Sequence, residues 1–255
     1  MEILYLICFF ILGTVLGSFY NVLGLRIPKN ESIIKPRSHC EKCGHVLEWF
    51  ELIPIFSFLF LKGKCRNCKT KLSWLYPFSE FFTGLLFCIS YYSFGFSFSL
   101  LMALILSSLL ILVIVSDLTY MIIPDRFIVI PAVLLLIIKL LAFGLESFLY
   151  SILYGVIAFG IMYVIMYIGS YILKKEALGG ADVKLMFIVG ICVEPLVTLV
   201  VIVLASVIAL PISLVLLLKN NENIIPFGPF IVIGLLIVFF TKLNTLEILK
   251  IFLNI

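Results

Sequence analysis

The sequence predicts an all-α integral membrane protein, a polytopic bundle of about eight transmembrane helices with one long polar loop. Two observations lead to this prediction. Hydrophobic residues make up 64% of the 255 positions and charged residues only 13%, whereas soluble domains are about 45–50% apolar and about 25% charged. Apolar stretches that approach the roughly 20 residues needed to cross a bilayer also recur along nearly the whole chain.

The apolar stretches define the expected crossings. The first has no Lys or Arg before it, so we expect a helix that stays in the membrane rather than a cleaved signal peptide. The predicted spans are residues 3–25, 75–94, 98–116, 127–143, 148–173, 183–193, 196–218 and 227–240. The sixth is too short to cross a bilayer alone at about 1.5 Å per residue. We expect it to extend toward Gly180, to tilt, or to be covered by its neighbours.

Basic residues gather in the polar segment 26–73, which holds ten of the 18 Lys and Arg residues. Loops rich in Lys and Arg stay on the cytoplasmic side of a membrane, so the pattern predicts a cytoplasmic loop with both termini outside. Because topology accounts for the charge, no nucleic-acid partner is expected. The predicted organisation is a first transmembrane helix (1–25), a cytoplasmic zinc-binding loop domain (26–73) and a transmembrane domain (74–255).

Two Cys-x-x-Cys pairs in this loop predict a structural zinc site. Each such pair forms a tight turn that points two thiolates at one metal, and a reducing cytosol keeps thiols free for it. Gly44 and Gly63 permit turns after the first pair and before the second. The expected ligands are Cys40, Cys43, Cys65 and Cys68.

Other interpretations of the cysteines stay open. The four could form two disulfides in an outer loop, although the basic charge disfavours that placement. His39 or His45 could replace a thiolate, but solvated loop histidines are the simpler account. The remaining cysteines stand singly in apolar spans, where packing roles are expected. They are Cys8, Cys88 and Cys192.

Three aspartates lie near the ends of predicted spans, where ionisable groups are costly and therefore functional candidates. Asp117 follows the third span, Asp125 follows Pro124, and Asp182 lies just before the sixth span. The predicted topology brings all three to the cytoplasmic face, where Asp117 and Asp182 could meet. Two adjacent carboxylates share one proton, so one acts as base and the other as acid, which is the chemistry of an aspartic protease.

The aspartates also have simpler explanations. Asp125 sits at a good helix start, where it would interact with the helix dipole. Asp182 could pair with Lys184 or cap its helix, and Asp117 could pair with Arg126. Two other classes of protein also remain open: a proton-coupled transporter, which uses membrane acids, and a non-catalytic scaffold whose zinc loop binds a partner.

Motifs between residues 17 and about 230 resemble, in the same order, those of the bacterial type IV prepilin peptidases, including those that process competence and secretion pseudopilins. The early motifs are Gly17-Ser18-Phe19-Tyr20-Asn21-Val22, Arg26-Ile27-Pro28, Ile53-Pro54 and Tyr76-Pro77 with Glu80. The later motifs are Ser116-Asp117-Leu118, Ile123-Pro124-Asp125, Gly179-Gly180-Ala181-Asp182-Val183-Lys184 and Pro226-Phe227-Gly228-Pro229. One departure is Ala181, which stands where the usual pattern has Gly.

The resemblance implies that Asp117 and Asp182 form the catalytic pair. It implies cleavage of a basic leader after a Gly, at the cytoplasmic face of the bacterial inner membrane, with prepilin or pseudopilin precursors as substrates. It also implies N-methylation of the new terminal residue with S-adenosylmethionine. The motif positions expected to support the pair are Asp125, Gly179, Gly180 and Lys184.

Overall fold

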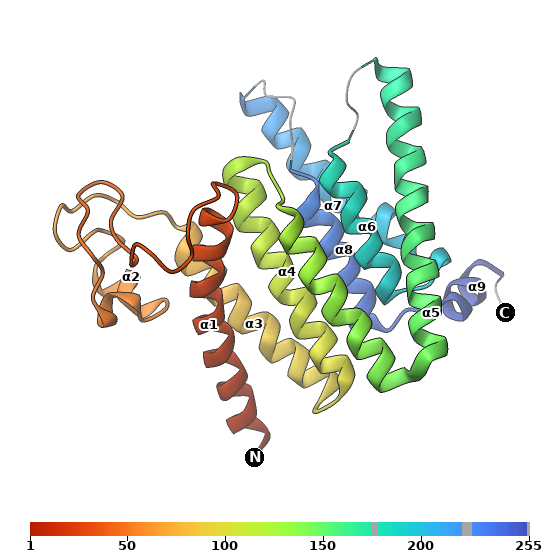
Figure 1. Ribbon diagram of the computed structural model, residues 1–255, viewed down its shortest axis with the longest axis horizontal. Helices are drawn as coiled ribbons and strands as arrows, with labels where there is room; N and C mark the ends of the chain where they lie inside the picture. The colour runs from red at the N-terminus through yellow and green to blue at the C-terminus, as the bar shows by residue number, and fades with distance from the viewer. Residues whose placement is uncertain (175–177, 221–225, 254–255) are drawn as a thin grey trace.

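The computed structural model describes residues 1–174, 178–220 and 226–253. They form helices packed side by side, with one long loop projecting beside them (Figure 1). The elements are α1 (Glu2–Arg26), η1 (Trp49–Leu52), α2 (Phe56–Phe60), α3 (Leu75–Phe94), α4 (Phe98–Tyr120), α5 (Asp125–Leu173), α6 (Gly180–Cys192), α7 (Pro195–Asn220), α8 (Gly228–Thr241) and α9 (Thr245–Leu253). Over these residues, strand-like pairing is limited to two isolated bridges in the loop.

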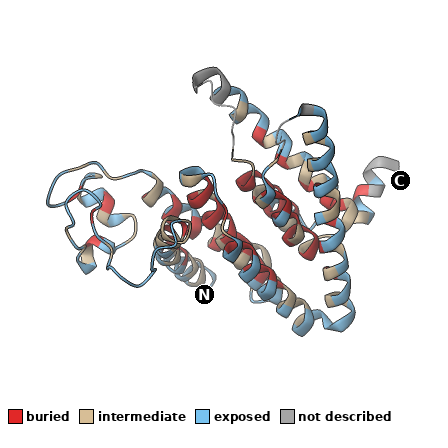
Figure 2. Ribbon diagram, turned by 45° about the horizontal axis from the view of Figure 1, so that its top comes forward, coloured by how far each residue is buried: buried red, intermediate tan, exposed pale blue. Residues whose placement is uncertain are grey.

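Four of the described helices are long and apolar enough to cross a membrane, namely α1, α4, α5 and α7. Of these four, α4 is the most buried, because α1, α3, α5 and α8 pack around it. Figure 2 shows the buried residues concentrated on the inner faces of these packed helices. The all-helical membrane architecture is therefore confirmed, whereas the predicted eight crossings exceed these four helices.

The helix boundaries follow the predicted spans closely. The second span coincides with α3, and the sixth begins at Gly180, as expected for a helix extended in that direction. The fourth and fifth predicted spans both lie within α5, which consists of two helices that meet at a kink at Gly144, where the backbone is not helical (φ 83°, ψ 178°). The sequence did not predict α9, whose Thr245 backbone N–H donates to the Glu194 carboxylate at 3.2 Å.

The short helix α6 lies inside the bundle. It packs against α5, α7 and α8, and its Leu185, Met186 and Ile188 side chains are at most 1% exposed. Gly190 allows α6 to approach α5, since a Cβ there would lie 2.7 Å from the Gly155 Cα and closer still to the Tyr154 carbonyl oxygen. The predicted covering of this helix by its neighbours is confirmed.

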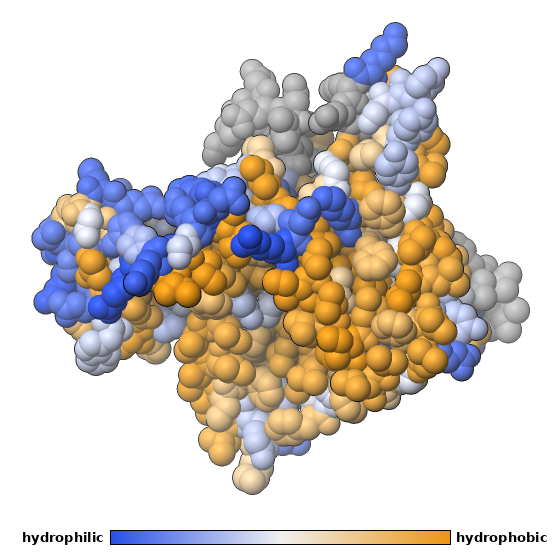
Figure 3. Space-filling view, in the orientation of Figure 1, coloured by the Kyte–Doolittle hydropathy of each residue, from blue (hydrophilic) through white to orange (hydrophobic). Residues whose placement is uncertain are grey.

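Surface hydropathy separates the bundle from the loop. Figure 3 shows hydrophobic side chains over most of the bundle, with hydrophilic ones gathered on the loop and along the upper end of the molecule. This distribution is the one expected when lipid rather than water surrounds the helices. The two candidate sites, the aspartates and the cysteines, lie in these two different parts.

Candidate active site and metal centre

Asp117 lies in the last turn of α4. The helix ends three residues later, at Tyr120, because Met121 adopts a left-handed conformation with φ 53° and donates its N–H to the Asp117 carbonyl at 2.9 Å. The residue is only 6% exposed, and its carboxylate accepts a hydrogen bond from the backbone N–H of Gly228 at the start of α8. The end of one helix and the beginning of another therefore hold this carboxyl group.

Asp182 lies in the first turn of α6 and is 8% exposed. Its carboxylate hydrogen-bonds the backbone of Gly179, the residue that caps the helix. Asp117 lies near enough to act on Asp182 electrostatically. The structure thus brings together two buried carboxyl groups that are far apart in the sequence.

No described cation neutralises this pair. The ion pairs that the sequence left open, Asp117 with Arg126 and Asp182 with Lys184, do not form within the described residues. Lys184 instead reaches Asp125, with 2.6 Å between Nζ and Oδ1, and so joins the start of α6 to the start of α5. Two neighbouring carboxyl groups without a cation ionise together only at high cost, so they favour a shared proton.

Gly228 is a site residue whose role the sequence did not reveal, although its motif was noted. A Cβ on Gly228 would lie 3.3 Å from Asp117 Oδ2 and 2.5 Å from Ile123 Cδ1. The absence of a side chain therefore lets the first turn of α8 approach the carboxyl group of Asp117. The signal was the glycine between two prolines, Pro226 and Pro229, which marks the start of a helix.

The departure at Ala181 has a simple structural account. Ala181 lies in the first turn of α6 and is not among the positive-φ residues, so its position makes no special demand for glycine. A Cβ on Gly180 would meet nothing within 4 Å. At Gly179 the Cβ would lie 3.2 Å from Asp182 Oδ2, so Gly179, unlike Gly180, adjoins the Asp182 carboxylate.

The four loop cysteines converge on one point. Their Sγ atoms all lie within 4.8 Å of one another, with 3.8 Å between Cys40 and Cys68 and 3.9 Å between Cys43 and Cys65. A tetrahedral zinc site with Zn–S bonds of about 2.3 Å has sulfur atoms about 3.8 Å apart. All four cysteines are free rather than disulfide-bonded. The arrangement therefore fits a zinc ion and not two disulfides.

The two cysteine pairs have the same local fold. In each, the residue after the second cysteine has positive φ, 71° at Gly44 and 58° at Lys69. Its N–H donates to the carbonyl of the first cysteine, at 2.8 Å for Gly44 and 3.0 Å for Lys69. Gly63 also has positive φ, 65°, in the turn before the second pair.

Hydrogen bonds with Thr70 lower the pKa of the Cys68 thiol to about 6. At Cys43 a backbone hydrogen bond with His45 acts in the same direction, but burial and the other three cysteines outweigh it and raise the pKa to about 11. The case for a metal therefore rests on the convergence of the four Sγ atoms.

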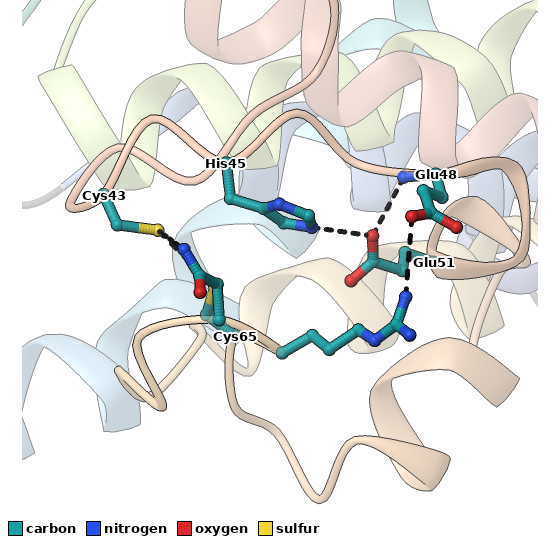
Figure 4. A network of polar contacts seen from close by, with 7 residues as sticks. Cys43, His45, Glu48, Glu51 and Cys65 are labelled. Atoms are coloured by element: carbon teal, nitrogen blue, oxygen red, sulfur yellow. Dashed lines mark hydrogen bonds and ion pairs between the residues drawn. The ribbon is translucent and has the colours of Figure 1, made fainter.

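A polar network beside the cysteines fixes the adjoining segment (Figure 4). His45 Nε2 lies 3.1 Å from the buried Glu51 carboxylate, which also accepts the Glu48 backbone N–H at 2.9 Å. Burial raises the pKa of Glu51, but these hydrogen bonds and the nearby Arg66 charge outweigh it and hold the pKa below its usual value. His45 is thus engaged with a carboxylate, and His39 with the Arg37 carbonyl, so neither replaces a cysteine.

Fold and site together define a class of protein: a multi-pass helical membrane protein with two buried acids at one end and a four-cysteine loop. Comparison with known proteins identifies the family. Residues 11–94 match the bacterial peptidase A24 N-terminal domain, and residues 104–214 match the type IV leader peptidase family. No solved structure matches the chain.

Several curated relatives agree with these matches. A prepilin leader peptidase/N-methyltransferase of Myxococcus xanthus is 35% identical over 86% of this chain and 65% of its own length. A type 4 prepilin-like proteins leader peptide-processing enzyme of Escherichia coli is 32% identical over 87% of this chain and 88% of its own. A Bacillus subtilis prepilin leader peptidase/N-methyltransferase is 48% identical over 47% of this chain and 48% of its own. The chain belongs to the type IV leader peptidase family.

Proposed function

We propose that the protein is an aspartic endopeptidase with Asp117 and Asp182 as its catalytic pair. The observation that supports this most directly is the meeting of two buried carboxyl groups from α4 and α6 with no cation paired to either among the described residues. A proton shared between them leaves one group as a base and the other as an acid. Peptide hydrolysis needs both.

In the proposed reaction the ionised carboxylate takes a proton from a water molecule, and the water oxygen attacks the carbonyl carbon of the scissile peptide. The protonated carboxyl group then donates its proton to the leaving nitrogen as the C–N bond breaks. The backbone N–H groups of Gly228 and Gly179 hold the two carboxyl groups in place throughout. The hydrolysis rate should therefore fall at both acidic and alkaline pH.

The proposed substrates are prepilin or pseudopilin precursors, cleaved after a Gly that follows a basic leader. The names of the curated relatives support this substrate class, and the apolar bundle surface suits a substrate helix lying in the bilayer. We propose eight crossings that place the aspartates and the loop at the cytoplasmic face of the inner membrane. The proposed division into residues 1–25, 26–73 and 74–255 follows from this topology.

We propose zinc as the loop's metal, with a structural role. Four thiolates complete a tetrahedral shell, which leaves no position open for a reacting water. The relatives' names also support an N-methyltransferase activity that uses S-adenosylmethionine. We assign no described residue to that donor and derive no step through it.

Intact-mass analysis of a pilin-like precursor with a Gly–Phe junction tests the proposal. The precursor is coexpressed with the wild type, with Asp117→Asn and with Asp182→Asn. We expect leader loss with the wild type only, since removing one member of such a pair lowers the rate by at least about 10³-fold. An added methyl mass would report the second activity.

Glu31→Gln is a matched control, because it removes one carboxylate from an exposed part of the loop. It should process the precursor as the wild type does. Leader loss with both Asp→Asn variants, in a host without its own prepilin peptidase, would overturn the mechanism. The competing hypotheses are a proton-coupled transporter and a zinc-loop scaffold. Both predict that the precursor keeps its full mass with the wild type as well as with every variant.

A further inference from the structure

The short helix α2 presents most of its apolar side chains to the outside. Phe56, Leu59 and Phe60 are 60%, 60% and 83% exposed. Only Phe58 is buried, and its ring lies 4.9 Å from that of Trp74. One phenylalanine therefore attaches α2 to the loop's interior, and the other large side chains need a partner outside the described chain.

A hydrogen bond fixes the depth of α2 relative to the bundle. The backbone N–H of Ile55, the residue before α2, donates to Glu80 Oε2 at 2.7 Å. Glu80 lies five residues beyond Leu75, the first residue of α3, which is about 7.5 Å along the helix axis. The helix α2 therefore begins beside the second turn of α3 rather than above its end.

Figure 1 agrees with this depth, since α2 lies on the lower side of the loop, below the level at which α1 ends. At the same level the outward face of α3 is also apolar, because Phe78, Phe81 and Phe82 are 56%, 45% and 36% exposed. Ile55 adopts φ 63°, which a β-branched residue rarely does. The fold thus holds α2 beside the apolar belt of the bundle against a local backbone preference.

Basic side chains adjoin this apolar surface. A cavity of about 280 Å³ is lined by Phe60, Leu61, Lys62, Lys64, Cys65, Arg66 and Lys69, without an acidic residue. Arg66 pairs with Glu48 at 3.6 Å, but no described carboxylate pairs with Lys62, Lys64 or Lys69. Cations next to exposed aromatic side chains are the pattern of a segment that lies in the interface of a bilayer containing anionic lipids.

The tryptophans also indicate that a lipid bilayer is the partner of this surface. The chain has only two, and both belong to this region: Trp49 in η1 and Trp74 directly before α3. They are 76% and 74% exposed. Tryptophan is enriched where membrane meets water, because its ring is apolar and its N–H is polar.

We infer that residues 55–69 dock on the leaflet next to the second turn of α3, with Phe56, Leu59 and Phe60 below the lipid headgroups and the three lysines on lipid phosphates. Anionic phospholipid is thus the partner of this surface. The contact anchors the cysteine loop beside the bundle, and it does so independently of any peptidase activity. Glu80 and the strained Ile55 set the depth of the anchor.

Fluorescence of a single tryptophan tests this inference in the full-length protein. Trp49→Phe, Trp74→Phe and Phe60→Trp together leave one reporter, in α2. The protein is placed in nanodiscs whose phospholipids carry bromine near the carbonyl end of the acyl chain. We expect brominated lipid to quench the emission by roughly half, as for a side chain buried some 5–10 Å into the interface. Iodide in the water phase should quench it weakly.

A charge-matched pair of variants tests the lysines. Lys62→Gln, Lys64→Gln and Lys69→Gln remove three charges from the cavity, and Lys35→Gln, Arg37→Gln and Lys42→Gln remove three from exposed positions elsewhere in the loop. The first set should raise the fraction of anionic lipid needed for half-maximal quenching by roughly threefold, and the second set should leave it unchanged. Zinc content should stay equal in all variants.

Three outcomes would overturn the inference. The first is a reporter open to iodide and insensitive to brominated lipid. The second is an equal shift for both sets of substitutions, which would reduce the effect to net charge. The third is lipid quenching that appears only after a pilin-like precursor is added, which would make a protein the partner of this surface.

Discussion

The bundle and the cysteine loop achieve order in different ways. The bundle has a large core in which side chains such as Leu106, Met186 and Ile188 are fully buried. In the loop the buried residues are few, namely Cys40, Glu51, Phe58 and Cys65. Such a segment buries too little apolar surface to fold alone and depends on a metal and on polar contacts. A mutation in the bundle should therefore act through helix packing, whereas a mutation in the loop should act through the metal site or its polar contacts.

The same contrast applies to the two candidate sites. Helix packing holds the aspartates, so their separation depends on how α4, α6 and α8 pack together. The cysteines are held by two similar turns that a metal would join, so their arrangement depends on the metal. A change in one site should leave the other largely intact, and four predictions test that independence.

Removing a metal ligand should have the largest effect. Cys40→Ser should abolish zinc binding, measured as a fall from about one zinc per purified chain to none. The loop should then become sensitive to protease, because metal binding supplies much of its folding free energy. Helical circular dichroism should remain, since the bundle does not need the metal. Loss of the helical signal together with zinc would mean that the two parts fold as one unit.

Filling a close helix contact should affect the bundle alone. Gly190→Ala places a methyl group 2.7 Å from the Gly155 Cα, where only backbone could yield, so we expect a loss of about 2–4 kcal/mol of stability. Gly160→Ala is the matched control, because its Cβ meets nothing within 4 Å. It should be neutral or stabilise by up to about 1 kcal/mol. Thermal unfolding in detergent compares the two, and similar shifts would contradict the packing argument.

The sequence predicted most of the bundle because apolar length is a strong signal. It located α3 at its observed boundaries and placed the sixth span at residues 183–193, with an extension toward Gly180 as one option, since a membrane permits little besides helices. It also proposed the aspartate pair, whose partners lie at the ends of spans. What it could not predict was the close approach of Gly228 to Asp117, because the distance between helices depends on side chains from several elements.

In the loop, the sequence predicted the cysteine set but not its surroundings. Cys-x-x-Cys spacing is a local signal, and the local turns follow from it. The link from Ile55 to Glu80 and the pairing of His45 with Glu51 join residues by contacts that no periodic pattern records. The amphipathic α9 was missed because nine residues are too few to resemble a span.

The loop's polar network should make a smaller contribution. Glu51→Gln keeps the shape of the side chain but removes the charge that His45 and the Glu48 N–H stabilise, so we expect a local loss of about 1 kcal/mol. Folding lowers the pKa of Glu51, so its contribution is complete above the unfolded value of about 4.3 and disappears as the pH falls through the lower folded value.

Hydrogen exchange of residues 45–52 in the wild type and in Glu51→Gln measures this contribution. The difference between the two proteins should be constant near pH 6 and vanish in stronger acid. Because both proteins carry the same cysteines, metal loss at low pH cancels in the comparison. A difference that grows as the pH falls would show that the sign of the linkage is wrong.

The smallest effect is expected at the ion pair between Lys184 and Asp125. Both side chains are at least half exposed, and such pairs contribute roughly 0–1 kcal/mol, less at high salt. A double-mutant cycle with Lys184→Gln and Asp125→Asn should therefore give a small coupling energy for unfolding that high salt removes. Because Lys184 lies two residues after Asp182, the same cycle on the hydrolysis rate tests a positioning role. A coupling energy that is larger for the hydrolysis rate than for unfolding would mean that the ion pair orients α6 for catalysis. Equal coupling energies would limit the ion pair to joining two helix ends.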